Sequence, residues 1–296
     1  MIKLTNKLYV LMIILLSIIF LVSIFLIIYL YLKTYEDSRI YSIRKVPEEY
    51  RVSLVNNFIN NNYKKDSILL LGDSQPNGHM YPTKYIFSNL LENKLKKKII
   101  NLAFQDSRIL DNIYIIEYLY QNNMKFETLI FNVNQSHIKQ NDFSRLKEQG
   151  LFPKDFLIGI FVELKSFIQL VVTPNPKFKP NEEIIFLKYE NYFEIEQERQ
   201  KEYFYKLEIF INLAKKISDN VIIYITPHSI NAVKHNNEND IEILNKFSED
   251  IIKFCENKGI KCIDIDITED NYYIDIVHFN SKGHEKMSEI FYDILK

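Results

Sequence analysis

The sequence is poor in glycine and proline, and it carries almost no net charge. Six glycines and eight prolines among 296 residues argue against internal repeats and flexible linkers. The formal net charge is −1, with lysine and arginine scattered along the chain, so the electrostatic footprint of a nucleic-acid binder is missing. No glycine-rich phosphate-binding loop and no Gly-x-Gly-x-x-Gly motif occurs. With 47% hydrophobic and 25% charged residues, the composition predicts a globular protein without a nucleic-acid partner.

Cysteine is nearly absent, which limits both metal binding and cross-linking. The two cysteines, Cys255 and Cys262, lie seven positions apart. A structural zinc site needs about four clustered ligands, and these two match no such pattern. His228 and His235 flank the end of an expected strand, but no carboxylates can be placed beside them. We therefore predict no metal and no cofactor, and we interpret the cysteines as core residues, with pairing in an oxidising compartment left open.

One long apolar run stands out at the N-terminus. Residues from Leu8 to Leu32 carry no charge, and this length exceeds the roughly 20 residues that span a bilayer as a helix. No Ala-x-Ala cleavage site follows the run, so an uncleaved anchor is favoured over a signal peptide. We predict a transmembrane anchor over residues 1–33 and a stalk or linker helix over 34–64. The flanking charges do not decide the orientation, and the function suggested below places the domain outside the cell membrane.

Beyond residue 65, short apolar runs alternate with segments of helical spacing. We expect five buried strands over residues 67–72, 98–103, 128–133, 221–226 and 261–265. Helices are expected over 83–95, 109–120, 241–255 and 281–295, and two more, over 155–172 and 194–216, within an insertion at about 135–219. This alternation predicts an α/β domain over residues 65–296, with a flavodoxin-like three-layer α/β/α architecture and a parallel five-stranded sheet. Sites in such sheets lie at the carboxyl ends of the strands.

Two motifs at opposite ends of this domain carry residues suited to nucleophilic chemistry. Gly72-Asp73-Ser74 follows the first expected strand directly. Asp275-Ile276-Val277-His278 precedes the last expected helix, for which Ser281 is the predicted N-cap. A serine needs an adjacent base to become nucleophilic, and an aspartate orients that base. An ordinary turn and helix cap is the alternative for the first motif, and a surface histidine is the alternative for the second.

Together the two motifs resemble the SGNH (GDSL) hydrolase superfamily, whose first block is Gly-Asp-Ser and whose last is Asp-x-x-His. The resemblance implies Ser74, His278 and Asp275 as catalytic residues. It also implies an oxyanion hole made by the backbone N–H of Ser74, a backbone N–H near Asp106, and the side chain of Asn134. The sequence departs from the family pattern at Asp106, where a glycine is expected. It departs again in Asn132-Val133-Asn134-Gln135, where the family has Gly-x-Asn-Asp.

The resemblance implies ester chemistry on the outer side of the membrane. The expected function is that of an esterase or O-acyltransferase on an acylated cell-envelope glycan or a small ester, with a multi-span acyltransferase as a candidate partner. The altered oxyanion blocks motivate an alternative, a non-catalytic scaffold that binds a glycan or a membrane partner. His79 lies five residues past Ser74, and His137 follows closely after Asn134. We interpret both as loop residues rather than substrate contacts.

Overall fold

The computed structural model describes residues 15–24, 26, 63–78, 85–103, 107–140, 184–186, 188, 193–194 and 196–296. The chain divides into two compact units, Met1–Arg39 and Ile40–Lys296. In the first unit, residues 15–24 form a helix whose apolar side chains are exposed. Within the described residues, no helix is both long and apolar enough to cross a membrane. Most of the predicted anchor and stalk, and the expected helix over 155–172, lie outside the described residues.

The second unit contains a parallel sheet of five strands, as the sequence predicted. The strands are β1 (Ile68–Leu71), β2 (Ile99–Asn101), β3 (Phe126–Val133), β4 (Ser218–Ile225) and β5 (Lys261–Asp264). Their order across the sheet is β2-β1-β3-β4-β5, and each neighbouring pair is parallel. The carboxyl ends of β1, β3 and β4 are therefore adjacent along one edge of the sheet.

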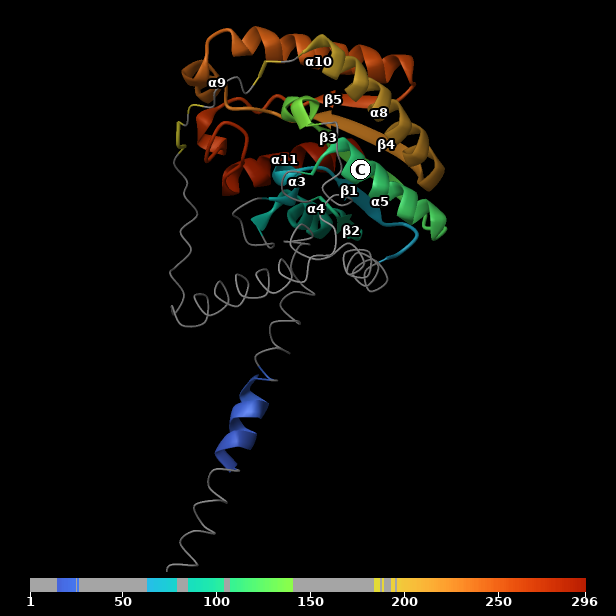
Figure 1. Cartoon of the computed structure of the whole chain (residues 1–296), viewed down its shortest axis with the longest axis vertical. Coiled ribbons are helices and arrows are strands. Elements are labelled where there is room, and N and C mark those ends of the chain that lie inside the picture. The colour runs from blue at the N-terminus through green and yellow to red at the C-terminus, as the bar shows by residue number, and fades with distance from the viewer. Residues whose placement is uncertain are drawn as a thin grey trace, which may run out of the picture. The chain divides into compact units, whose positions relative to one another are not determined.

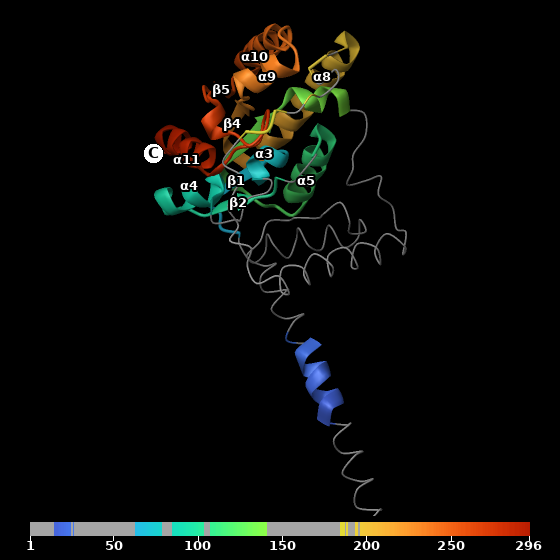
Figure 2. The same ribbon diagram turned by 90° about the vertical axis from the view of Figure 1, so that its left-hand side faces the viewer.

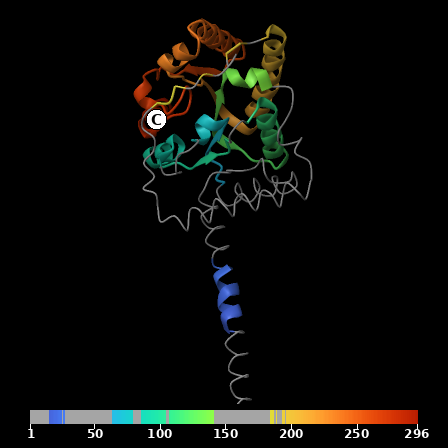
Figure 3. The same cartoon turned by 60° about the vertical axis from the view of Figure 1, so that its left-hand side comes forward.

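Helices cover both faces of the sheet, which confirms the three-layer architecture. They are α3 (Ser74–Asn77), α4 (Phe87–Leu95), α5 (Ile109–Gln121), α8 (Gln197–Ile217), α9 (Ile230–Asn236), α10 (Asp240–Asn257) and α11 (Ser281–Leu295), together with the 3₁₀ helices η3 (Gln135–Gln140) and η4 (Asp270–Tyr272). The core clusters place α5, α8 and α10 on one face of the sheet and α4 with α11 on the other (Figure 1). In Figure 2 the strands run between α4 and α11 on the left and α5 and α8 on the right, and Figure 3 shows the same sandwich at an intermediate angle.

The strands read as continuous apolar runs because both of their faces are buried. Successive side chains of a strand point to opposite faces. In β1, Leu69 and Leu71 belong to the core cluster beneath α5 and α8, whereas Ile68 and Leu70 belong to the cluster beneath α4 and α11. A sheet covered on both sides leaves its strand ends as the place where polar side chains can gather.

Helix α8 packs on the sheet through one face. The sequence predicted a helix over 194–216 within an insertion, and α8 occupies almost this range, between β3 and β4 in the chain. Its side chains Tyr203, Leu207 and Phe210 are fully buried in the core cluster beneath α5 and α8. The polar and aromatic character of the segment obscured this role, because its apolar residues recur only along the one face that meets the sheet.

The N-cap of the last helix lies one residue earlier in the chain than predicted. Asn280, not Ser281, is the N-cap of α11, and its Oδ1 accepts a hydrogen bond from Gly283 N at 3.0 Å. Both residue types cap helices well, so sequence alone does not separate them. The reason for the choice is a second contact, since Asn280 Nδ2 donates to Asn271 O at 2.7 Å and so ties the helix start to η4.

Gly72 is required by the conformation of the chain at the end of β1. Its φ is +142°, and a Cβ at this position would overlap Asn132 Oδ1. Gly259 also has a positive φ, of +60°, but a Cβ there would meet nothing within 4 Å. A side chain at Gly259 would therefore meet only backbone strain, whereas a side chain at Gly72 would meet both backbone strain and steric overlap.

We predict that Gly72→Ala destabilises the domain far more than Gly259→Ala. The second substitution should cost about 1–2 kcal/mol of unfolding free energy, the cost of a left-handed conformation for a residue with a Cβ. The first should cost at least twice that amount, because Asn132 must also move. Urea unfolding followed by circular dichroism measures both, and equal losses would show that the overlap at Gly72 is relieved without cost.

Candidate active site

Ser74 is presented by a tight turn between β1 and α3. Gly72 follows the strand, and Asp73 is the N-cap of α3, with its Oδ1 accepting a hydrogen bond from Gln75 N at 3.0 Å. Ser74 is therefore the first residue of a short helix at the carboxyl end of the sheet, and its side chain is half-buried. A parallel sheet places its sites at this edge, so the serine stands where substrate can reach it.

Two segments that are 204 residues apart in the sequence meet at Ser74. His278 Nε2 lies 2.8 Å from Ser74 Oγ. On the other side of the imidazole ring, His278 Nδ1 lies 2.7 Å from Asp275 Oδ2. The second contact requires the Nδ1 hydrogen, because an ionised carboxylate only accepts, so in the neutral ring Nε2 carries no hydrogen and can accept the hydroxyl proton. The structure thus brings together the serine, histidine and aspartate that the sequence singled out.

The Asp275 carboxylate is held in place and kept ionised by its own loop. Its Oδ1 accepts hydrogen bonds from the backbone N–H groups of Val277, at 2.9 Å, and His278, at 2.8 Å. Burial alone would raise the pKa of Asp275, but the hydrogen bonds and the charge of His278 outweigh burial, so the pKa lies below its ordinary value of 3.8. An ionised Asp275 fixes the tautomer of His278 and stabilises the imidazolium that forms when the ring takes a proton.

The loop that carries these two residues is a small folded unit. Ile274 N donates to His278 O at 2.9 Å, and Tyr273 and Phe279 form an antiparallel bridge. Gly283, in the first turn of α11, lies so close to this loop that a Cβ would overlap Tyr272 O. The loop is thus closed on itself and seated directly on the last helix.

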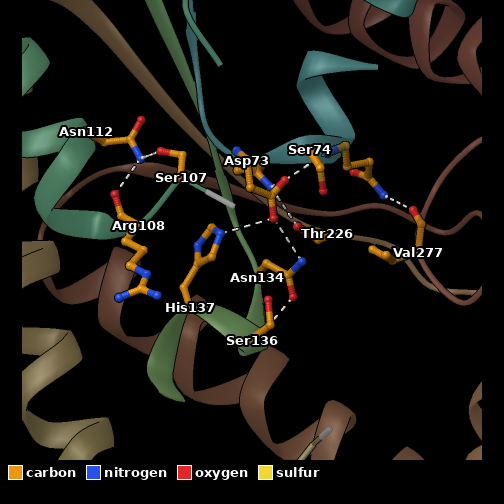
Figure 4. A network of polar contacts seen from close by, with 12 residues as sticks. Asp73, Ser74, Ser107, Arg108, Asn112, Asn134, Ser136, His137, Thr226 and Val277 are labelled. Carbon is orange, nitrogen blue, oxygen red and sulfur yellow. Dashed lines mark hydrogen bonds and ion pairs between the residues drawn. The ribbon is translucent and has the colours of Figure 1, made fainter. Parts of the chain in front are cut away.

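Asp73, the neighbour of Ser74, lies at the centre of a separate buried network (Figure 4). Its Oδ1 accepts from Asn132 Nδ2 at 2.8 Å in addition to the Gln75 N–H. Its Oδ2 accepts from Asn134 Nδ2 at 3.0 Å and lies 3.0 Å from His137 Nε2. The network therefore joins the end of β1 to the end of β3 and to η3.

The network keeps Asp73 charged inside the protein. Burial raises the pKa of Asp73, but the contacts with His137, Gln75 and Asn134 outweigh burial and lower it from 3.8 to about 2. Our interpretation of His137 as a loop residue was wrong: the ring is 4% exposed, lies in η3 and faces the Asp73 carboxylate. The physical reason is that a buried carboxylate needs polar or charged partners, and the His137 ring lies 3.0 Å from it.

The oxyanion residues implied by the resemblance are only partly within the described residues. Asn134 is buried beside Ser74; its Nδ2 donates to Asp73, and its Oδ1 accepts from Ser136 N at 3.1 Å. An amide Nδ2 has two N–H groups, so one remains for an oxyanion. Asp106 lies outside the described residues. The oxyanion role of Asn134 and of the Asp106 backbone stays a prediction.

Two departures from the family pattern have structural roles instead. Asn132, which replaces a glycine, is fully buried; its Oδ1 accepts from Asp73 N at 3.0 Å, and its Nδ2 also donates to Thr226 Oγ1 at 3.0 Å. Gln135, which replaces an aspartate, donates from Nε2 to Phe193 O at 2.6 Å. Both substitutions are thus absorbed into hydrogen bonds that bind β3 to its surroundings.

His228 lies close to the site but is not charged at neutral pH. Burial lowers its pKa from 6.5 to about 4, although the carboxylates of Asp73 and Asp275 act in the opposite direction. Its ring packs edge-on against Phe193, with centroids 5.6 Å apart. Among the residues that the structure describes, no group of three potential metal ligands is present.

Gln75 and Asn132 are the site residues that sequence reasoning missed. Both side chains are buried, at 1% and 0% exposure, and both make hydrogen bonds to segments far away in the chain. The signal available in the sequence was their position, since each lies at or next to the carboxyl end of an expected strand. Position alone, however, does not say which polar side chain turns inward.

Comparison with known proteins returned matches only among solved structures. No protein-family model matches the chain, and no curated protein matches it. A lipolytic protein of the G-D-S-L family from Veillonella parvula is similar with a TM-score of 0.48 and 14% identity, over 77% of this chain and 97% of that one. Est24, a carbohydrate acetylesterase from Sinorhizobium meliloti, has a TM-score of 0.46 and 11% identity, over 78% and 98% of the two chains. The structures that this chain resembles thus include hydrolases of the SGNH/GDSL type.

We predict that Asp73→Asn destabilises the domain and weakens the dependence of its unfolding free energy on pH in the acid range. Removing the charge places an amide N–H₂ group among the three donors Gln75 N, Asn132 Nδ2 and Asn134 Nδ2, and breaking a buried ion pair costs about 3 kcal/mol or more. The pKa of Asp73 is lower in the folded chain, so its contribution is complete above pH 3.8 and is lost as the pH falls through about 2. The stability difference between wild type and variant should therefore shrink between pH 4 and pH 2.

Urea unfolding at a series of pH values tests this expectation. Asp66→Asn is the matched control, because Asp66 is exposed and should leave stability within about 0.5 kcal/mol of wild type. A stability difference at Asp73 that does not change with pH would contradict the assignment of its charge.

Proposed function

We propose that this protein is a serine esterase that forms an acyl-enzyme at Ser74. The observation that carries the proposal is the unbroken chain of short contacts from Ser74 Oγ through the His278 ring to Asp275, at 2.8 and 2.7 Å. A nucleophile within reach of a base, with the base oriented by a third group, is the arrangement that acyl transfer requires. The three residues come from both ends of the domain, so their alignment is a property of the fold and not of a local turn.

In the first half of the reaction, Ser74 attacks the carbonyl carbon of an ester. As the Oγ–carbon bond forms, the Oγ proton passes to His278 Nε2, and Asp275 stabilises the resulting imidazolium. The tetrahedral intermediate then collapses, and the same proton goes to the leaving alcohol. Ser74 is left acylated, and His278 is neutral again.

In the second half, an acceptor hydroxyl attacks the acyl-enzyme. His278 removes the proton of the acceptor and returns it to Ser74 Oγ as the acyl–serine bond breaks. Water as the acceptor gives an esterase, and a sugar hydroxyl gives an O-acyltransferase. Asn134 and backbone N–H groups are proposed to stabilise the oxyanion in both halves.

The location and the substrate class are further parts of the proposal. The support for a membrane anchor is the charge-free run from Leu8 to Leu32. An anchored esterase domain outside the membrane would act on acyl groups of the cell envelope, and an acylated glycan is the substrate that we propose. A multi-span protein that delivers acyl groups is the corresponding candidate partner.

A non-catalytic scaffold is the competing function. It is motivated by the departures from the family pattern at Asp106, Asn132 and Gln135. Asp106 lies outside the described residues, whereas Asn132 and Gln135 make hydrogen bonds that leave the Ser74–His278 contact intact. The geometry therefore favours catalysis over binding alone, and covalent labelling separates the two functions directly.

We predict that Ser74→Ala abolishes hydrolysis of p-nitrophenyl acetate and labelling by a fluorophosphonate probe. Loss of the nucleophile should lower kcat by about 10⁴-fold or more, and Asp275→Asn should lower it by about 10⁴-fold by disturbing the tautomer of His278. Ser248→Ala, in the middle of α10, is the matched control and should leave both rates unchanged.

Product analysis with purified acylated glycan distinguishes the two acceptors. Release of free carboxylic acid indicates esterase activity, and a new ester on an added glycan indicates transfer. The proposal fails if wild-type protein is neither labelled at Ser74 nor able to turn over the ester, and the scaffold function would then be preferred.

A further inference from the structure

Gln75 directly follows the nucleophile, and its side chain is almost completely buried, with 1% exposure. Its Nε2 donates two hydrogen bonds, to Val277 O at 2.9 Å and to Pro227 O at 3.2 Å. An amide Nε2 has two N–H groups, so this donor capacity is fully used. A buried donor group of this kind is as a rule hydrogen-bonded, and here both N–H groups are directed at backbone carbonyl oxygens.

The two carbonyl groups belong to two neighbouring segments, which are joined to each other by the hydrogen bond from Ser229 N to Ile276 O at 3.1 Å. Pro227 lies between β4 and α9, and Val277 lies between Asp275 and His278. The carbonyl group of Val277 is part of the peptide bond that leads into His278. A hydrogen bond to that oxygen therefore restrains the backbone of the base itself. Figure 4 shows Val277 facing the turn that carries Ser74.

The backbone of Gln75 is restrained as well. Gln75 N donates to Asp73 Oδ1 at 3.0 Å, so the residue is held at its main chain by the buried network and at its side chain by the loop. The internal hydrogen bonds of the loop fix Asp275 relative to His278. They do not fix either residue relative to Ser74. The hydrogen bond from Ser229 N to Ile276 O holds the loop against the segment after β4, and the bond from Gln75 Nε2 to Val277 O joins the loop to the Ser74 turn itself.

We propose that Gln75 is a positioning residue that sets the distance between Ser74 and His278 by joining the nucleophile turn to the loop of the base. The inference rests on the proposed esterase function for its kinetic consequences, whereas its geometric consequence is independent of any activity. Misplacement of reacting groups by about 1 Å costs roughly 100-fold in rate, so a clamp at this point has a measurable effect.

The first test is Gln75→Met in the full chain, which keeps the length of the side chain and removes both donors. We expect kcat for p-nitrophenyl acetate and the rate of fluorophosphonate labelling at Ser74 to fall about 10- to 100-fold, with KM within about threefold of wild type. Gln121→Met is the matched control, because Gln121 is exposed at the end of α5, and it should label at the wild-type rate.

The second test uses Gln75→Glu and a pH profile. A protonated glutamate still donates one hydrogen bond, whereas an ionised one donates none and faces two carbonyl oxygens. Burial raises the pKa of such a glutamate above its ordinary value of about 4.3. The labelling rate relative to wild type at the same pH should therefore fall as the pH rises from 5 to 8. A role limited to general packing would give a ratio that does not change with pH.

A crystal structure of Gln75→Met separates this proposal from the proposed function. We expect the distance between Ser74 Oγ and His278 Nε2 to increase from 2.8 Å to beyond the hydrogen-bonding limit of about 3.5 Å. If wild-type protein is not labelled at all, the esterase function fails, and this distance alone decides the role of Gln75. The proposal is overturned by a variant that retains the wild-type distance, or by a Gln75→Glu ratio that is flat with pH. If Gln75→Met melts below the assay temperature, the Gln75→Glu profile carries the test.

Discussion

The carboxylate of Asp73 is the interaction on which the site depends. Three hydrogen-bond donors converge on it: Gln75 N and Asn132 Nδ2 on one oxygen, and Asn134 Nδ2 on the other, which also lies 3.0 Å from His137 Nε2. A buried charge is tolerated only when it is paired and hydrogen-bonded, so each donor is constrained by the cost of leaving the carboxylate unsatisfied. As a result, the ends of β1 and β3 and the start of α3 are all hydrogen-bonded to the same carboxylate.

The order of the strands sets a second constraint, because His278 follows β5, which is not a neighbour of β1. β5 is an edge strand, separated from β1 by β3 and β4, and the loop after β5 must return across the end of β4 to reach Ser74. Contacts mark this path: Ile230 N donates to Thr268 O, and Ser229 N donates to Ile276 O. The segment after β4 thus holds the returning loop by backbone hydrogen bonds. Gln75 binds both this segment, at Pro227 O, and the loop, at Val277 O.

The sequence predicted the sheet and singled out Ser74, Asp275 and His278, which the structure brings together, but it did not predict the contacts that hold them. Strands buried on both faces produce apolar runs that can be read directly, and the resemblance to SGNH hydrolases rests on Ser74, Asp275 and His278 as they stand in the chain. Asn132, His137 and Gln75 have no comparable local signal. Gln75 meets Val277 across 202 positions, and such pairings depend on the folded topology rather than on neighbouring residues. The prediction of the N-cap of the last helix was wrong for a simpler reason, since two residue types that cap helices well, Asn280 and Ser281, are adjacent.

The two aspartates near Ser74 differ in role because their surroundings differ. Asp73 is buried and Asp275 is half-buried, and both have lowered pKa values, so both are ionised at neutral pH. Asp275 directs one oxygen at His278 and can stabilise the charge that appears on the ring during the reaction. Asp73 has both oxygens occupied by fixed donors, and its negative charge would otherwise oppose an oxyanion forming beside Ser74. The polar partners of Asp73 thus offset a charge that the Gly-Asp-Ser turn places next to Ser74, and this is why His137 and Asn134 belong to the candidate site as much as Ser74, His278 and Asp275 do.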